Sequence, residues 1–79
     1  MKFTQYFLET RKRLDRKIIL DEWILRAIYI PIKKEIQNDG RVRYWVSIPE
    51  MENRILRVIC LEDGETVHTA FFDRRYKQD

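Results

Sequence analysis

The chain has 79 residues, of which 44% are hydrophobic and 37% are charged, and its formal net charge is +3. A chain of this length forms one domain with a thin hydrophobic core, so we expect residues 1–79 to be a single globular domain. Two glycines and two prolines exclude a low-complexity chain, and the net charge is too small to indicate a partner by itself.

Several features favour a cytoplasmic protein. The longest nearly apolar run, from Ala27 to Ile32, is far shorter than the roughly 20 residues of a membrane-spanning helix, so we expect no membrane partner. No apolar stretch of about 7–15 residues follows Met1 and Lys2, so we expect no secretory signal peptide. The single cysteine, Cys60, cannot form an internal disulfide, which suits a reducing compartment.

Residues 3–10 admit two interpretations. Phe3, Tyr6 and Phe7 recur at helical spacing. The same segment is rich in aromatic and β-branched residues, which favours a strand. We expect a strand here, followed by a charged turn over Arg11–Lys17.

The segment Asp21–Ile30 is predicted to be a helix. Its apolar residues form a single stripe, and Pro31 ends it because proline lacks an N–H and clashes with the preceding turn. Asp21 is suited to cap the first backbone N–H groups and to complement the positive end of the helix dipole. The residues of the stripe are Trp23, Ile24, Ala27 and Ile28.

Alternating apolar and polar residues then predict two strands, 32–36 and 42–48, joined by Asn38-Asp39-Gly40. A two-residue turn would place the apolar side chains of the two strands on opposite faces. A three-residue loop with a left-handed glycine sets Ile36 opposite Val42 and aligns the apolar sets, so we expect this loop.

Residues 54–61 are almost continuously apolar, which indicates a central strand buried on both faces. Asp63-Gly64 predicts a tight two-residue turn into a last strand, Glu65–Phe72. We therefore expect an α+β fold: an antiparallel meander of four strands, or five if residues 3–10 form one, with one or two helices on one face. The predicted turn puts one set of side chains on the same face: Leu56, Val58, Cys60, Val67, Thr69 and Phe71.

Metal and cofactor sites are not indicated. One histidine and one cysteine supply no zinc-type ligand set, the acidic residues 62–65 lack calcium-loop spacing, and no glycine-rich phosphate loop is present. His68 titrates near neutral pH and could act as an acid or base on a phosphodiester. A half-exposed histidine on a strand is more often without a catalytic role.

Arginines outnumber lysines ten to six, and arginine is preferred for bidentate contacts with phosphate. Arg41, Arg43 and Trp45 alternate on one face of their strand. If Arg57 and His68 share that face, it is a basic surface with an exposed indole, which suits single-stranded RNA. In the alternative, Trp45 packs under the C-terminal tail or in a dimer contact.

The C-terminal segment Asp73-Arg74-Arg75-Tyr76 carries a basic pair beside a tyrosine. Such a pair could bind a phosphate group. It could equally form surface ion pairs with Glu62 and Glu65, which is the commoner outcome.

Motifs over about residues 16–75 resemble a group of short uncharacterised bacterial proteins of cyanobacterial type, itself distantly similar to the BrnT and RelE toxins of toxin–antitoxin pairs. The resemblance implies a RelE/BrnT-like fold of helices on an antiparallel sheet, action on RNA, and an antitoxin-like protein partner. An early histidine expected near Tyr6 is absent, and only Arg74 matches the toxins' C-terminal arginine pattern. The matching motifs are Glu22-Trp23-Ile24, Asp39-Gly40-Arg41, Leu56-Arg57-Val58, Glu62–His68 and Phe71–Arg74.

Three functions follow from these features. We favour a protein-interaction or self-associating module, for instance a homodimer. The first alternative is a metal-independent ribonuclease in which His68 moves a proton while Arg57 and Arg74 stabilise the phosphate. The second is RNA binding without cleavage. The binding residues that we expect, for RNA or for a protein partner, are Arg41, Arg43, Trp45, Arg75 and Tyr76.

Overall fold

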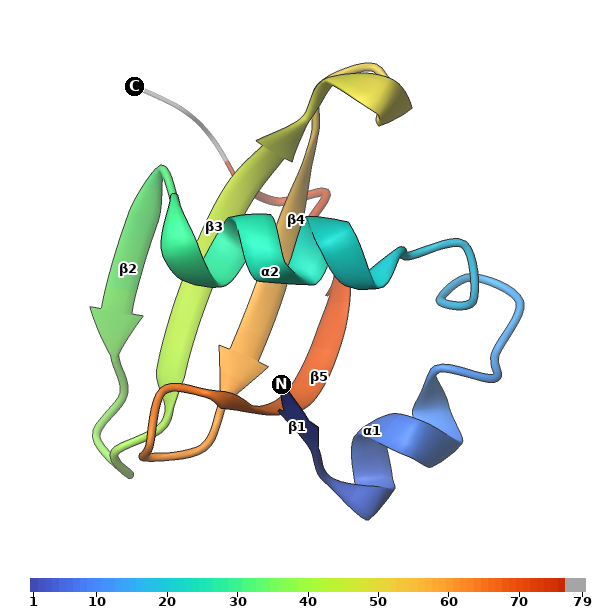
Figure 1. Cartoon of the computed structure of the whole chain (residues 1–79). Coiled ribbons are helices and arrows are strands. Elements are labelled where there is room, and N and C mark those ends of the chain that lie inside the picture. Colours follow the sequence, from blue (N-terminus) through green and yellow to red (C-terminus); the bar gives the residue numbers. More distant parts are fainter. Residues whose placement is uncertain (77–79) are drawn as a thin grey trace.

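The computed structural model of the chain describes residues 1–76. Five strands form one open sheet in the order β1-β5-β4-β3-β2, in which β1 runs parallel to β5 and all other neighbours are antiparallel. Helix α2 crosses β3 and β4 on one face, and α1 lies beside β5 (Figure 1). The elements are β1 (Lys2–Phe3), α1 (Gln5–Thr10), α2 (Asp21–Tyr29), β2 (Lys33–Ile36), β3 (Val42–Ile48), the 3-10 turn η1 (Pro49–Met51), β4 (Arg54–Cys60) and β5 (Thr66–Phe72).

The α+β prediction is confirmed, and β2 to β5 form the predicted antiparallel meander. The core lies between the helices and one face of the sheet. Within residues 1–76, no helix has the length and apolar character needed to cross a membrane. The largest fully buried side chains are Ile24, Ile48, Leu56, Val58, Val67 and Cys60.

Helix α2 forms almost where the apolar stripe predicts it. Trp23, Ile24 and Ala27 are buried against the sheet, and the helix ends two residues before Pro31. The predicted capping role of Asp21 is wrong, because the N-cap position falls on Leu20 and no side chain caps the helix. The carboxylate of Asp21 instead accepts a hydrogen bond from the guanidinium of Arg11.

The predicted strand over residues 3–10 is also wrong. Only Lys2–Phe3 pairs with β5, and the chain then turns into α1. The cause is Thr4, whose hydroxyl caps the helix by accepting a hydrogen bond from the backbone N–H of Phe7 at 3.0 Å. The helical spacing brings the rings of Phe3 and Phe7 to 5.1 Å and buries Phe7 in the core.

The β2–β3 hairpin has the predicted register. Ile36 pairs with Val42 across a three-residue loop, and Gly40 has the left-handed conformation with φ of +90°. The backbone N–H of Gly40 donates to the carbonyl of Gln37 at 2.9 Å and closes the turn. The apolar alternation of the two strands therefore fixed this register correctly.

The turn between β4 and β5 is wider than the predicted two-residue turn. The carbonyl of Leu61 accepts from the N–H of Gly64, while the N–H of Leu61 donates to the carbonyl of Thr66, both at 2.9 Å. The N–H of Thr66 donates instead to the carboxylate of Asp63 at 2.8 Å. This side chain replaces a backbone partner, so the loop opens to four residues, 62–65.

A β-bulge then changes the register along β5. Cys60 pairs with Val67, as the turn prediction requires, but Ile59 pairs with Thr69. His68 is therefore an extra residue with no partner of its own on β4.

The bulge reverses the predicted faces of the second half of β5. Ala70 and Phe72 lie opposite Val58 and Leu56 and pack on the core, whereas Thr69 and Phe71 were expected there. The edge of the Phe72 ring meets Trp23 of α2, with ring centroids 6.3 Å apart. The bulge therefore turns Ala70 and Phe72 inward in place of Thr69 and Phe71.

Candidate functional site

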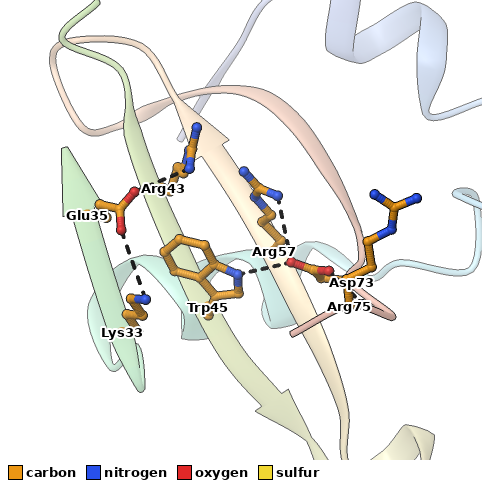
Figure 2. Close-up of polar contacts among 7 residues, drawn as sticks. All are labelled: Lys33, Glu35, Arg43, Trp45, Arg57, Asp73 and Arg75. Carbon is orange, nitrogen blue, oxygen red and sulfur yellow. Dashed lines mark hydrogen bonds and ion pairs between the residues drawn. The ribbon is translucent and has the colours of Figure 1, made fainter. Parts of the chain in front are cut away.

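The face of the sheet away from α2 carries most of the residues predicted to bind a ligand. Trp45 of β3 pairs with Arg57 of β4, which in turn pairs with Phe71 of β5. Arg43 lies two residues before Trp45, on the same face (Figure 2). The predicted grouping of these three β3 and β4 residues on one face is correct.

The indole of Trp45 is buried, with 5% of its surface exposed, so the predicted exposed stacking platform is wrong. Its Nε1–H donates to Oδ2 of Asp73 at 3.2 Å, and the ring of Tyr76 stacks on it with centroids 5.9 Å apart (Figure 2 shows the bond to Asp73). Lys33 and Arg57 place their cationic groups 5.2 and 5.4 Å from the ring centre. The alternative, that Trp45 packs under the C-terminal tail, is confirmed.

The arginines of this face are paired with carboxylates. Arg43 forms an ion pair with Glu35 of β2 at 3.2 Å, and Glu35 also lies 4.0 Å from Lys33 (Figure 2). Arg57 lies 3.7 Å from Asp73. Such partly exposed pairs contribute little stability, but they neutralise the guanidinium charge locally. The expected basic surface is therefore a network of alternating charges.

Arg41, the residue before β3, is paired too. Its Nε lies 3.8 Å from the carboxylate of Asp39, and both groups are exposed. The backbone N–H of Arg41 also donates to Asp39, at 3.0 Å. The contacts of Arg41 thus belong to the β2–β3 loop, while Arg43 and Trp45 belong to the network at the centre of the face.

His68 is held at the bulge, beside α1. Its Nδ1 lies 3.2 Å from the hydroxyl of Thr4, and its ring stacks on Tyr6 with centroids 4.8 Å apart. Because the Thr4 oxygen already accepts from Phe7, its own proton is available to Nδ1, which fits an unprotonated ring nitrogen. Burial, assisted by the charge of Arg41, lowers the pKa of His68 below its ordinary value.

The three predicted catalytic residues do not form one cluster. Arg57 lies opposite Phe71, three residues along β5 from His68. Arg74 lines a groove with Arg16 from the loop before α2. Within residues 1–76, no hydrogen bond or ion pair joins any two of the three.

The remaining tail residues have separate roles. The backbone N–H of Arg75 donates to Asp73 at 3.0 Å, and its side chain projects away from the indole (Figure 2). Tyr76 covers Trp45. The predicted pairs of the basic tail with Glu62 or Glu65 are not among the ion pairs of the described chain, and Asp73 is the carboxylate that organises this segment.

Metal ligands are not assembled anywhere in the described part of the chain: no three His, Cys, Asp or Glu side chains come close enough together to hold an ion. Cys60 is buried in β4, and burial raises the pKa of its thiol to about 12. This thiol is protonated and unreactive at neutral pH.

A surface that the sequence reading missed lies at the β2 edge. All four residues of β2 are exposed, and α2 packs on β3 and β4 without covering it. Ile36 points to the α2 side of the sheet, yet 69% of its surface is exposed. We use the name β2-edge patch for the four exposed apolar residues of β2 and of residues 29–32 that lead into it: Tyr29, Ile30, Ile32 and Ile36.

Comparison with protein-family models, with curated proteins and with solved structures found no match. The assignment of function therefore rests on the chemistry of the surfaces described above.

Proposed function

We propose that this protein is a protein-interaction module that associates with a second copy of itself through β2. The observation that carries the proposal is an uncovered edge strand beside the β2-edge patch, in which Tyr29 and Ile36 are 72% and 69% exposed. An edge strand offers unpaired backbone N–H and C=O groups to another strand. Large exposed apolar side chains next to an open sheet edge are characteristic of surfaces that bind another chain.

Antiparallel pairing of two β2 strands about a twofold axis at Lys34 sets opposite charges and apolar side chains opposite each other. In this register Lys33 lies opposite Glu35 of the second copy, and Ile32 lies opposite Ile36 of the second copy. A shift of the axis to Lys33 or to Glu35 loses both of these pairs, while each of the three registers places one pair of like charges on the axis. Opposite charges and apolar pairs facing each other across strands are each favourable, by about 0.2–1 kcal/mol.

The same register places the two Lys34 side chains opposite each other, which opposes association. Lysine on an edge strand is a common device against uncontrolled pairing. The proposed dimer is therefore reversible and closed by its twofold symmetry, because each β2 edge is used once.

The network around Trp45 gives less support to the RNA hypotheses. Its indole is covered by Tyr76, and its guanidinium groups already face carboxylates. Ribonuclease activity also needs an acid or base next to phosphate-binding groups, whereas His68 contacts Thr4 and Tyr6. An antitoxin-like partner would use the same β2 edge by strand addition.

Sedimentation velocity over a range of protein concentrations tests the proposal. We expect a monomer–dimer equilibrium in the wild type and a monomer for Ile36→Glu, since an exposed side chain is replaced without loss of core packing. Leu14→Glu is the matched control, because Leu14 is 80% exposed and lies outside the β2-edge patch. A wild-type protein that stays monomeric at every concentration contradicts self-association, and equal dimerisation of both variants contradicts the assigned edge.

A further inference from the structure

A groove of about 770 Å³ lies between the loop that precedes α2 and the ends of β4 and β5. Three arginines line it, each from a different segment: Arg16 from the loop, Arg54 from the start of β4, and Arg74 from the tail. The fold thus gathers cationic side chains that are far apart in the sequence. None of them belongs to the β2-edge patch, so this groove is independent of the proposed self-association.

The arginines of the groove differ from most others in the chain. Of the ten arginines, five form ion pairs with carboxylates: Arg11, Arg26, Arg41, Arg43 and Arg57. The other five have no ion pair within residues 1–76, namely Arg13, Arg16, Arg54, Arg74 and Arg75. Three of these five line the groove, so positive charge without a partner is concentrated there.

The Arg16 side chain is held in place by a few contacts that use only part of its hydrogen-bond donors. Its Nη1 donates to the hydroxyl of Thr69 at 3.2 Å, and its guanidinium lies 5.6 Å from the centre of the Phe71 ring. Its Nε is buried and has no hydrogen-bond partner among the described residues. The Arg16 guanidinium is thus fixed against β5 by Thr69 and Phe71, while no carboxylate of the described residues neutralises its charge.

The two carboxylates of the groove do not cancel this charge. Asp73 already accepts a hydrogen bond from the Trp45 indole and pairs with Arg57, which does not line the groove. Asp15 is then the carboxylate left to oppose the arginines. Three guanidinium groups of the groove thus face one carboxylate, Asp15, that has no ion pair of its own among the described residues, so the groove favours an anion.

The remaining lining is apolar, from Ile18, Ile55, Phe71 and Phe72. Guanidinium forks match the geometry of phosphate oxygens, and apolar walls suit the organic part of an ester. The volume is within the range of about 300–1,000 Å³ typical of small-molecule sites. We propose that this groove binds a phosphate monoester that carries an aromatic or apolar group, as a nucleoside monophosphate does.

Isothermal titration calorimetry of the full chain with three probes tests the proposal: adenosine 5′-monophosphate, inorganic phosphate and adenosine. We expect saturable binding of the monophosphate, binding of inorganic phosphate about tenfold weaker, and no binding of adenosine. Amide chemical-shift changes on adding the monophosphate are expected at Arg54, Ile55 and 71–74, and not at β2.

Matched variants identify the groups responsible. Arg54→Gln and Arg74→Gln each weaken monophosphate binding by roughly tenfold or more, since each removes a charged hydrogen bond. Arg13→Gln removes an exposed arginine outside the groove, so it should change the affinity for the monophosphate by less than about twofold. Asp15→Asn tightens binding several-fold, which loss of structure would not do.

Several results would overturn the proposal. They are absence of saturable monophosphate binding, equal affinity for the monophosphate and inorganic phosphate, and an equal loss of affinity in Arg13→Gln. Tighter binding of a short single-stranded RNA, again reduced by Arg54→Gln, would assign the groove to a nucleic-acid backbone instead. Ile36→Glu is expected to bind the monophosphate as the wild type does, so failure of self-association and failure of this site are distinguishable.

Discussion

Removal of the Asp73 carboxylate is the most severe test of the contacts described on the sheet face away from α2. Its side chain is 13% exposed, accepts the Trp45 indole N–H at 3.2 Å and pairs with Arg57 at 3.7 Å. Asp73→Ala leaves a buried indole donor unsatisfied, which costs about 1–3 kcal/mol. It also leaves Arg57 without its carboxylate between the Trp45 and Phe71 rings, where the Arg57 Nε is already buried and unpaired.

We expect Asp73→Ala to lower the free energy of unfolding by about 2–4 kcal/mol in total, because the two effects share one network and do not add fully. For a domain of this size the corresponding fall in Tm is about 10–20 °C. Asp73→Asn keeps an acceptor for the indole and is expected to lose about half as much, since only the charge pairing with Arg57 is removed.

Urea unfolding followed by tryptophan fluorescence measures this change, with circular dichroism as a second probe. Glu62→Ala is the matched control, because it removes an exposed carboxylate that has no polar contact within the described residues. We expect the control to change stability by less than about 0.5 kcal/mol. A loss for Asp73→Ala no larger than that of the control would refute the reasoning.

Two further predictions concern pH. The pKa of His68 is lowered from 6.5, chiefly by burial, so the folded state favours the neutral ring. We therefore expect the contribution of His68 to stability to be full above pH 6.5 and to be lost as the pH drops through the lowered pKa. Urea titrations at several pH values measure this dependence, and His68→Gln should show a flatter profile. The pKa of Asp63 is lowered to about 2 by hydrogen bonds from Thr66 and from backbone N–H groups, and that of Glu50 to about 2 by Arg26. Their contribution to stability is present above about pH 4.5 and lost toward pH 2. The double variant Asp63→Asn with Glu50→Gln should therefore show a smaller difference in unfolding free energy between pH 6 and pH 2.5 than the wild type. An unchanged difference would contradict this assignment.

Local patterns predicted the elements whose determinants lie close together in the sequence. The register of the β2–β3 hairpin followed from alternation and from Gly40, and α2 followed from its stripe and Pro31. The missed helix α1 also has a local signal. Thr4 stands three residues before Phe7 as an N-cap, and aromatic content outweighed that signal in our prediction.

The features that the sequence did not reveal depend on long-range packing. The bulge at His68 accompanies the contact of Phe72 with Trp23 of α2, and no pattern within β5 specifies that contact. Trp45 and Asp73 are separated by 28 residues, and their hydrogen bond exists only once the tail folds back over the sheet. The exposure of Ile36 likewise depends on where α2 crosses the sheet.

Cross-linking at Lys34 tests the proposed association most directly. In the proposed register the two Lys34 residues lie on the twofold axis, and residues directly opposite in an antiparallel pair have Cα atoms about 4.5–5.5 Å apart, within disulfide range. Native Cys60 does not compete, because it is buried and its thiol pKa is about 12. We predict that Lys34→Cys forms a covalent dimer under mild oxidation at concentrations where Leu14→Cys stays monomeric. Equal cross-linking of both variants, or no cross-linking of Lys34→Cys, would contradict pairing of the two β2 strands.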